Sequence, residues 1–479
     1  GWAHERVLEV PQINGWSNEY VMPLFLTATC EFSRYDDPQR TAAGELVLLN
    51  PRGGAIALLT TTRLVYSGGN YSLMDNFFEF GFSQLDSGLT TLGDLVEATK
   101  VNTASDANSR KFNLLGDPAL TLAIPKYNVV TTEFPDTMKG LSKVTIRGFV
   151  ADRNNQKMQD FNGIIYPSVF DKSREIKGLN NDNPSDTNYF KFNLQTAVIF
   201  KGRASVVNGD FEFTFVVPKD VSLEYGNARI SYYAENDTSD ANGNETNFLL
   251  GGYDENAVED KQGPDVDLYM NDEAFVFGGL TDESPNMLAH IFDDNGLNTS
   301  GNGIGHDLVA VLDQNTTNSI LLNDYYEAEL DDYQKGTINY PFSELDAGQH
   351  TLTLKVWDVY NNSGEANTEF VVAESAELAL DHVLNYPNPF TTNTAFYFEH
   401  NQPGQGLDVK IEIFTVSGKL IKTLDTFIAE NSYRVGPIYW NGLDEYGDLI
   451  GKGVYIYKLK VAVPSGESAD YFEKLVILN

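Results

Sequence analysis

The first quarter of the chain contains two uninterrupted apolar runs, a pattern typical of strands that are buried on both faces. These runs are residues 20–29 (YVMPLFLTAT) and residues 54–60 (GAIALLT). Amphipathic stretches at residues 73–85 and 92–98 predict helices after them. Because strands alternate with helices here, we predict an α/β unit with a parallel sheet over residues 1–126.

From residue 127 onward the pattern changes to short alternating segments that are separated by Gly, Asn and Asp clusters. The alternation predicts strands at residues 142–150, 211–217, 228–234, 265–270, 306–312 and 350–356. The polar run at residues 235–245 predicts a long surface turn, and residues 258–264 predict a linker. Regular short strands with turn signals indicate two immunoglobulin-like β-sandwich modules, residues 127–262 and 263–374.

The last hundred residues form a further predicted unit, which begins after the short acidic linker at residues 374–381. Two prolines at alternate positions of residues 385–390 (NYPNPF) keep that stretch extended and outside any helix. Residues 408–415 and 453–461 alternate between apolar and polar side chains, as strands do. We predict a third β-sandwich over residues 381–479.

Acidic residues dominate the charge of the chain. There are 68 Asp and Glu against 33 Lys and Arg, which gives a formal net charge of −35 over 479 residues. Such a surface repels phosphate backbones, so we expect no nucleic acid as a partner. We interpret the excess as a solvated acidic surface outside the cell, on which loop carboxylates are candidates for Ca²⁺.

Two polar loops have oxygen-bearing side chains at close spacing. Residues 293–298 (DDNGLN) carry them at alternate positions, as a Ca²⁺ loop does, but the distant glutamate of an EF-hand is missing. An ordinary Asn/Asp/Gly turn is the alternative, and residues 237–245 are a weaker case. His306 and Asp307 have no second histidine at metal-binding spacing. No cofactor is therefore required by the sequence, and Ca²⁺ stays a candidate ligand.

Cys30 is the single cysteine of the chain, which rules out an internal disulfide and a cysteine-based zinc site. It follows the apolar run at residues 20–29, where a parallel sheet would place the carboxyl end of a strand. A thiol at that edge can act as a nucleophile, especially beside a histidine. The alternative from position alone is a half-buried structural cysteine. No run of 18 apolar residues predicts a transmembrane helix.

Residues 27–38 (TATCEFSRYDDP) resemble the nucleophile loop of the gingipain family of cysteine peptidases, whose catalytic domain has a caspase-like α/β fold. Residues 1–3, 44–57 and 112–122 (FNLLGDPALTL) resemble further segments of that family in the same order and spacing. The resemblance implies that Cys30 is the catalytic nucleophile. It also implies that the backbone N–H of Cys30 contributes to the oxyanion hole.

The family's catalytic histidine precedes the tryptophan that Trp2 resembles, so the resemblance places it upstream of Gly1. His4 lies on the other side of Trp2, and we interpret it as a surface histidine. We therefore expect the chain to be the downstream portion of a longer protein, without its catalytic base and inactive by itself. Tyr66 has two interpretations, a wall of the substrate pocket or a core residue.

The end of the chain resembles the C-terminal signal domain of type IX secretion cargo, in residues 385–390, 413–419 (IFTVSGK), 440–444 (WNGLD) and 453–457 (GVYIY). That resemblance implies docking on an outer-membrane shuttle barrel of the PorV type. The predicted docking residues are Tyr386, Pro387, Asn388, Pro389 and Phe390.

The whole order of domains resembles the sortase of the same secretion system, as do residues 269–272, 303–307 and 357–363. This implies a cell-surface transpeptidase that is held peripherally at the outer membrane. It would remove the signal domain of cargo proteins and join the cargo to anionic lipopolysaccharide. The alternatives are a secreted gingipain-like peptidase that is itself cargo, and a catalytically silent scaffold that binds the barrel and cargo.

Overall fold

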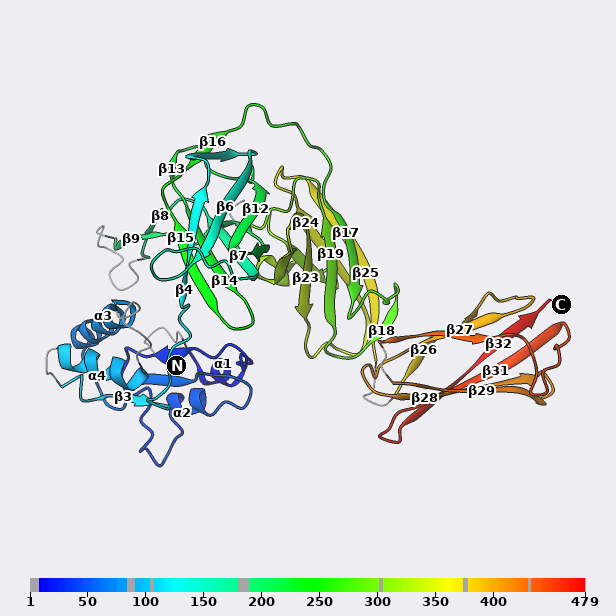
Figure 1. Ribbon diagram of the computed structural model, residues 1–479. Coiled ribbons are helices and arrows are strands. Elements are labelled where there is room, and N and C mark those ends of the chain that lie inside the picture. Colours follow the sequence, from blue (N-terminus) through cyan, green and yellow to red (C-terminus); the bar gives the residue numbers. More distant parts are fainter. Residues whose placement is uncertain are drawn as a thin grey trace. The chain divides into compact units, whose positions relative to one another are not determined.

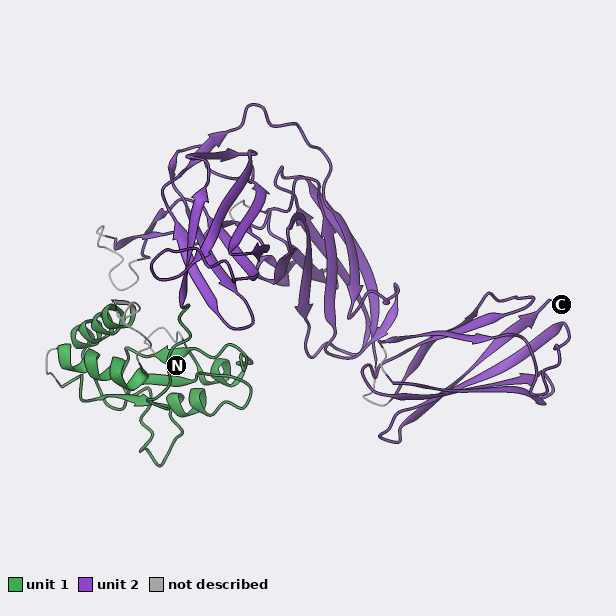
Figure 2. Cartoon of the chain, viewed as in Figure 1, with its two compact units in different colours: residues 1–125 green, residues 126–479 purple. Residues whose placement is uncertain are grey.

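The computed structural model describes residues 8–83, 91–103, 107–179, 189–300, 305–373, 378–429 and 432–478. The chain divides into two compact units, residues 1–125 and residues 126–479 (Figures 1 and 2). The first unit combines helices with a small sheet. The second consists of β-strands, with only two short 3-10 helices among its described residues. In the described part of the chain, no helix is both long and apolar enough to cross a bilayer.

The first unit is built around a three-stranded sheet with the order β1-β2-β3. Its elements are α1 (Val10–Asn14), β1 (Leu24–Leu26), α2 (Ala43–Leu48), β2 (Ala57–Thr61), α3 (Ser67–Ser83), α4 (Leu92–Asn102) and β3 (Phe112–Leu115). β1 and β2 are parallel, as predicted, but β3 runs antiparallel to β2. Two helices, α3 and α4, connect β2 to β3. The chain leaves at the carboxyl end of β2 and β3 begins beside that same end, which makes the two strands antiparallel.

Helices cover both faces of this sheet. All five residues of β2 are buried. Leu58 packs with Ile13 of α1, whereas the next residue, Leu59, packs with Leu73 of α3 and Leu95 of α4. Because successive side chains of a strand point to opposite faces, β2 is the central strand of a layered α/β unit. The apolar run at residues 54–60 is thus explained.

The run at residues 20–29 was expected to be a strand buried on both faces, and this is wrong for most of it. Only Leu24–Leu26 form a strand, and each of these residues is half-buried. Tyr20 and Val21 are 92% and 80% exposed. The reason is that β1 lies at the edge of the sheet and that only these three residues have partners on β2.

The first β module, residues 126–262, has a closed ring of strands as its main sheet, accompanied by two smaller sheets, β13-β16-β5 and β8-β9, so it is not the simple two-layer sandwich that was expected. Its sheet has the order β10-β7-β11-β12-β6-β4-β15-β14, and the pairing of β14 with β7 closes it. Its strands are β4 (Tyr127–Glu133), β5 (Thr137–Gly140), β6 (Lys143–Ala151), β7 (Gly163–Phe170), β8 (Arg174–Lys177), β9 (Lys191–Leu194), β10 (Val198–Lys201), β11 (Ala204–Val207), β12 (Asp210–Val216), β13 (Gly226–Asn227), β14 (Arg229–Glu235), β15 (Asp240–Glu245) and β16 (Leu249–Tyr253). Phe211, Phe213 and Phe215 of β12 point into its core. Closure leaves fewer open strand edges than two separate sheets would.

The predicted surface turn at residues 235–245 is wrong over its second half. Residues 240–245 form β15, which pairs along its whole length with β14 and also meets β4. The turn itself is confined to residues 236–239, where Asn236 accepts hydrogen bonds from the N–H groups of Thr238 and Ser239. The turn was predicted because the residues of β15 are mostly polar. A strand whose side chains are only partly buried needs few apolar residues.

The second β module, residues 263–373, is a two-layer sandwich. One sheet has the order β17-β19-β23-β22, the other β18-β25-β24-β20-β21. The strands are β17 (Asp265–Met270), β18 (Gly279–Thr281), β19 (Asn286–Phe292), β20 (Val309–Leu312), β21 (Ile320–Leu321), β22 (Tyr326–Glu329), β23 (Asp332–Pro341), β24 (Gly348–Trp357) and β25 (Ser363–Val372). The short 3-10 helices are η1 (Thr316–Asn318) and η2 (Asn323–Tyr325). β17 coincides with the strand that alternation predicted.

The C-terminal module, residues 378–478, is also a two-layer sandwich, with sheets β26-β27-β30 and β29-β28-β31-β32. The strands are β26 (Leu380–Tyr386), β27 (Thr394–His400), β28 (Leu407–Thr415), β29 (Leu420–Ile428), β30 (Arg434–Trp440), β31 (Gly453–Ala462) and β32 (Ser468–Ile477). Tyr457, Leu459 and Val461 point from β31 into the core, as the alternation predicted.

Candidate active site

Cys30 lies in the loop that follows β1, at the carboxyl end of two parallel strands. The loop stays attached to β2 on both sides of the cysteine. The Thr27 N–H donates to the Leu59 carbonyl (3.1 Å), and the Ser33 N–H donates to the Thr61 carbonyl (2.9 Å). The carboxyl ends of parallel strands are where α/β proteins build their active sites.

Buried hydroxyl groups hold this loop from beneath. The Thr27 hydroxyl donates to Thr60 Oγ1 (2.8 Å), and Ser33 Oγ lies 2.8 Å from the same oxygen. The Thr61 hydroxyl donates to the carbonyl of Thr29. These four hydroxyl side chains are all at least nine-tenths buried. A connected network of satisfied buried polar groups fixes one loop conformation, so the backbone around Cys30 is pre-organised.

The thiol of Cys30 is exposed and lies beside the loop that follows β2. The Val65 N–H donates to Sγ (3.5 Å), and the thiol in turn donates to the Val65 carbonyl (3.4 Å). Both backbone groups of Val65 thus hold the sulfur in place. The exposure of Cys30 does not fit the alternative of a half-buried cysteine.

The backbone N–H of Cys30 has no acceptor among the residues that the structure describes. The next two residues differ, since the Glu31 N–H donates to the Arg63 carbonyl (3.4 Å) and the Phe32 N–H to Thr61 Oγ1 (3.4 Å). A free N–H at the nucleophile is what an oxyanion hole requires, because it can accept the charge that develops on an attacked carbonyl.

Ion pairs balance the charges around the loop. Arg34 pairs with Glu31 (3.2 Å), and Arg63 donates two hydrogen bonds to the carboxylate of Asp36 (3.0 and 2.6 Å). The hydrogen bond from Arg63 holds the pKa of Asp36 below its usual value. With both arginines paired, activation of the thiol depends on the Val65 N–H and on an additional base.

That base is not among the described residues of the first unit. Of the six histidines, five lie beyond residue 126, and the sixth, His4, lies outside the described residues together with Trp2. The expectation that the catalytic histidine precedes Gly1 stays a prediction.

Residues 1–123 match the model of peptidase family C25. This is the gingipain family, so the resemblance seen in the sequence is confirmed, and this C25 segment assigns the first unit to a cysteine peptidase type of enzyme. The segment contains Cys30 and all of the contacts described above.

Solved structures also align with the chain. Dimeric latent PorU from Porphyromonas gingivalis aligns at 28% identity over 81% of this chain, with a TM-score of 0.35, and this chain spans 38% of its length. SGBP-B of the mixed-linkage glucan utilization locus of Bacteroides ovatus, in complex with a mixed-linkage heptasaccharide, aligns at 11% identity. That alignment covers 74% of this chain and 71% of the other, with a TM-score of 0.22. None of the curated proteins matches the chain.

Tyr66, next to Val65 in the C25 segment, is 74% exposed. The Lys111 ammonium lies 5.9 Å from the centroid of its ring. Packing in the core, one of the two interpretations of Tyr66, is therefore wrong, and an exposed aromatic ring stands near the nucleophile. Val65 itself was missed by the sequence analysis, because its contact with Cys30 joins positions 35 residues apart.

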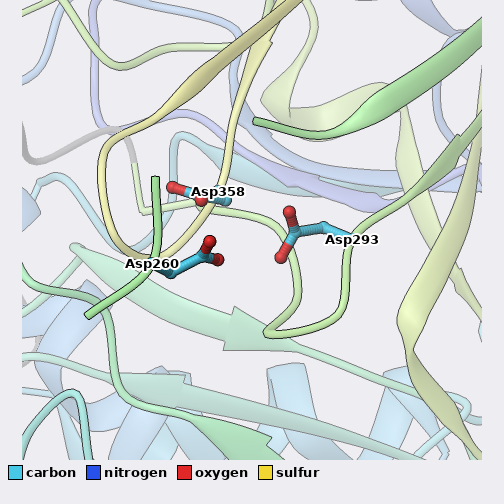
Figure 3. Close-up of side chains that lie close together, drawn as sticks. All are labelled: Asp260, Asp293 and Asp358. Carbon is cyan, nitrogen blue, oxygen red and sulfur yellow. The ribbon is translucent and has the colours of Figure 1, made fainter. Parts of the chain in front are cut away.

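A second polar site lies in the β modules, where three carboxylates from separate segments converge (Figure 3). Asp260 precedes β17, Asp293 follows β19 and Asp358 follows β24, and one oxygen of each lies within 4.8 Å of the others. Asp293 and Asp358 are 5% and 0% exposed. No described residue forms an ion pair with any of the three. Such oxygen ligands suit Ca²⁺.

Burial, together with the neighbouring charges of Asp358 and Asp260, raises the pKa of Asp293 to about 7, against hydrogen bonds from two backbone N–H groups that lower it. Burial also raises the pKa of Asp358. Of the loop at residues 293–298, only Asp293 joins the cluster. Asn298 instead donates to Asp220 (3.1 Å), which also binds His306 (2.7 Å). Much of residues 237–245 is strand β15, so that loop gains no support as a cation site.

The predicted docking residues divide into two groups. Tyr386, Pro387, Asn388 and Pro389 are exposed, but Phe390 is 3% exposed and packs against Trp440 in the core. Phe390 is therefore wrong as a docking residue, because its ring belongs to the sandwich interior.

Asn388, although exposed, pairs with the edge of β32. Its side-chain amide donates to the Lys474 carbonyl (2.8 Å) and accepts from the Val476 N–H (3.0 Å). The Phe390 backbone continues this pairing with Val476 and Leu478. The segment thus covers a strand edge, whereas Tyr386 and the two prolines remain exposed.

Proposed function

We propose that the complete protein is a cell-surface cysteine endopeptidase and transpeptidase, a sortase held peripherally at the outer membrane. It would remove the C-terminal signal domain of type IX secretion cargo and transfer the cargo to anionic lipopolysaccharide. The observation that carries the proposal is the geometry of Cys30: an exposed thiol with a donor on its sulfur and a free N–H, inside a C25 segment.

The chemistry follows from that geometry. The Cys30 thiolate attacks the scissile carbonyl, and the Cys30 N–H donates to the oxyanion. The peptide C–N bond then breaks, and the amine of the signal domain leaves with a proton from a histidine outside the described residues. The cargo stays on sulfur as a thioester. An amine of the acceptor attacks that thioester, releases the thiolate and forms a new amide bond, whereas water would give hydrolysis.

Contacts of the C-terminal module support its retention on this protein. The buried carboxylate of Glu399 accepts a hydrogen bond from the Leu280 N–H (3.1 Å), and the Tyr433 hydroxyl donates to Asp282 (3.0 Å). Both contacts join the C-terminal module to the second β module. A domain destined for removal has no need of a buried polar contact with the rest of the chain. The exposed Tyr386, Pro387 and Pro389 would face the shuttle barrel.

The test uses the full-length protein with a cargo that carries a signal domain. The Cys30→Ala variant should lose at least about a thousand-fold in processing rate, since the nucleophile is removed. Ser72→Ala on α3 is the matched control, because its hydroxyl is exposed and contacts only its own helix. With the active protein, added hydroxylamine should yield a cargo hydroxamate, which mass spectrometry detects.

Two outcomes would favour the alternatives. Undiminished processing by Cys30→Ala would leave the protein a scaffold that binds the barrel and cargo. A mature protein whose intact mass lacks the residues after about position 375 would instead be a secreted peptidase that is itself cargo.

A further inference from the structure

We infer that Asn70 and Asn108 are a coupled pair of positioning residues that hold the Cys30 thiol against the Val65 N–H. This inference rests on the proposed role of Cys30 as nucleophile. Neither asparagine touches the sulfur, so both would act through the two backbone segments on either side of it.

Asn108, in the segment before β3, forms two hydrogen bonds with the backbone of the residue next to Val65. Its Oδ1 accepts from the Tyr66 N–H (3.1 Å), and its Nδ2 donates to the Tyr66 carbonyl (2.6 Å). One side-chain amide thus occupies both backbone groups of Tyr66, as a neighbouring strand would. This fixes the peptide that follows Val65, whose carbonyl accepts from the thiol, and it restrains Val65, whose own N–H points at the sulfur.

Asn70, in the first turns of α3, connects Asn108 to the nucleophile loop through hydrogen bonds. Asn108 Nδ2 also donates to Asn70 Oδ1 (3.2 Å), and Asn70 Nδ2 donates to the Ala28 carbonyl (3.0 Å). Ala28 lies two residues before Cys30. The two amides therefore form one path from the Val65–Tyr66 peptide to the loop that carries the thiol.

The side-chain amide of asparagine supplies both the donors and the acceptor that these contacts use. Asn108 donates twice and accepts once, and Asn70 accepts once and donates once through its side chain. Aspartate has no donor when ionised, and leucine of similar shape has neither donor nor acceptor. The two side chains are 6% and 1% exposed, so an unmet group there would stay out of contact with water. A buried polar pair of this kind specifies one arrangement of the segments that it joins.

The experiment measures alkylation of the single cysteine by iodoacetamide, as a rate against pH, in this chain and its variants. In Asn108→Leu and Asn70→Leu the Val65 N–H loses its fixed place. The rate at neutral pH should therefore fall about three- to ten-fold, and the midpoint of the curve should move to higher pH. The double variant should fall no further than the worse single variant, because the pair acts as one unit.

Asn76→Ala is the matched control on the same helix, since it removes one amide hydrogen bond, to Thr103 (2.9 Å), away from the cysteine. It should lower the melting temperature while leaving the alkylation curve in place. Asn70→Ser serves if a leucine variant does not fold, and it should show a smaller shift in the same direction. Alkylation curves of folded Asn70 and Asn108 variants that coincide with that of the parent chain would overturn the inference.

This readout is separate from the proposed function, because it needs no substrate. Unchanged curves beside a Cys30→Ala variant that cannot process cargo would reject the positioning pair and keep the enzyme. Shifted curves in a protein that processes no cargo would reject the enzyme and keep the pair.

Discussion

The loop around Cys30 and the segment at residues 385–390 were both singled out by resemblance, yet the fold uses their residues in opposite ways. In the loop, Thr27, Phe32 and Ser33 are buried and hydrogen-bonded, while Cys30 is exposed and its N–H has no acceptor among the described residues. In the segment, Phe390 fills the core and Asn388 covers a strand edge. Resemblance to a family motif therefore does not distinguish residues that react from residues that stabilise the fold.

The difference lies in where the polar groups are satisfied. After Cys30, the N–H groups of Glu31, Phe32 and Ser33 all have partners within the protein, whereas the Cys30 N–H has none among the described residues. In the segment the polar groups that define the motif are themselves paired, and only Tyr386 remains as a large exposed side chain, at 71%. The loop is thus arranged for an external reactant, and the segment chiefly for stability.

The largest effect that tests this contrast is expected at Phe390. Phe390→Ala should lower the free energy of unfolding of the C-terminal module by about 3–5 kcal/mol, because a large buried ring is removed. Chemical denaturation of the chain, followed by tryptophan fluorescence from Trp440, measures it. A loss below about 1 kcal/mol would mean that the ring is free for a partner after all.

The carboxylate cluster is a third case, because Asp293 and Asp358 are buried and no described cation pairs with the cluster. The folded-state pKa of Asp293 is about 7, above the ordinary 3.8, so the folded chain binds the extra proton between these values. Its contribution to stability is therefore greatest below about pH 4 and is lost as pH rises towards 7, on the order of 3 kcal/mol.

Melting temperatures between pH 4 and 8, with EDTA or with Ca²⁺, check this expectation. Bound Ca²⁺ should restore stability at pH 7.5 by about 2–3 kcal/mol at a hundred-fold excess over its dissociation constant. Asp293→Asn should flatten the pH dependence and weaken the response to Ca²⁺. Identical melting curves in EDTA and Ca²⁺ would show that the cluster does not bind Ca²⁺.

A smaller effect is expected at Asn388. Asn388→Ala should cost about 1–2 kcal/mol, because the Val476 N–H and the Lys474 carbonyl each lose a partner at the strand edge. Asn388→Asp keeps the acceptor for Val476 and should cost less. Hydrogen exchange at Val476 measures the change directly. Unchanged protection in Asn388→Ala would assign Asn388 to partner binding instead.

The smallest effect on stability is expected at Tyr386, at most about 0.5 kcal/mol for Tyr386→Ala, since the ring is mostly exposed. If this ring contacts the shuttle barrel, the same variant should weaken binding about ten-fold. Binding measured with the purified barrel and this chain separates the two properties. A stability loss as large as that of Phe390→Ala would erase the distinction between the two residues.

Several features were accessible from the sequence because they depend on local periodicity. The alternation at residues 265–270 coincides with β17, and the uninterrupted apolar run at residues 54–60 marks the buried strand β2. Position alone left a structural cysteine as the alternative, and only the resemblance of residues 27–38 to a peptidase family selected Cys30 as the candidate nucleophile. The prediction from periodicity was wrong at two places. β15 is a strand although its residues are polar, because it pairs with two other strands, and residues 20–23 are not a strand, because no strand lies beside them.

The sequence by itself determined the alternation of strands and the helices of the first unit, since side-chain burial repeats along each element, and its composition determined the acidic charge. It also singled out Cys30, through the resemblance of its loop to a peptidase family. Only the tertiary structure decided which residues meet. It brought Val65 to the sulfur of Cys30, joined Asn70 to Asn108, gathered Asp260, Asp293 and Asp358, and placed Phe390 in the core. Such contacts depend on how distant segments cross, and a local pattern carries no information about that.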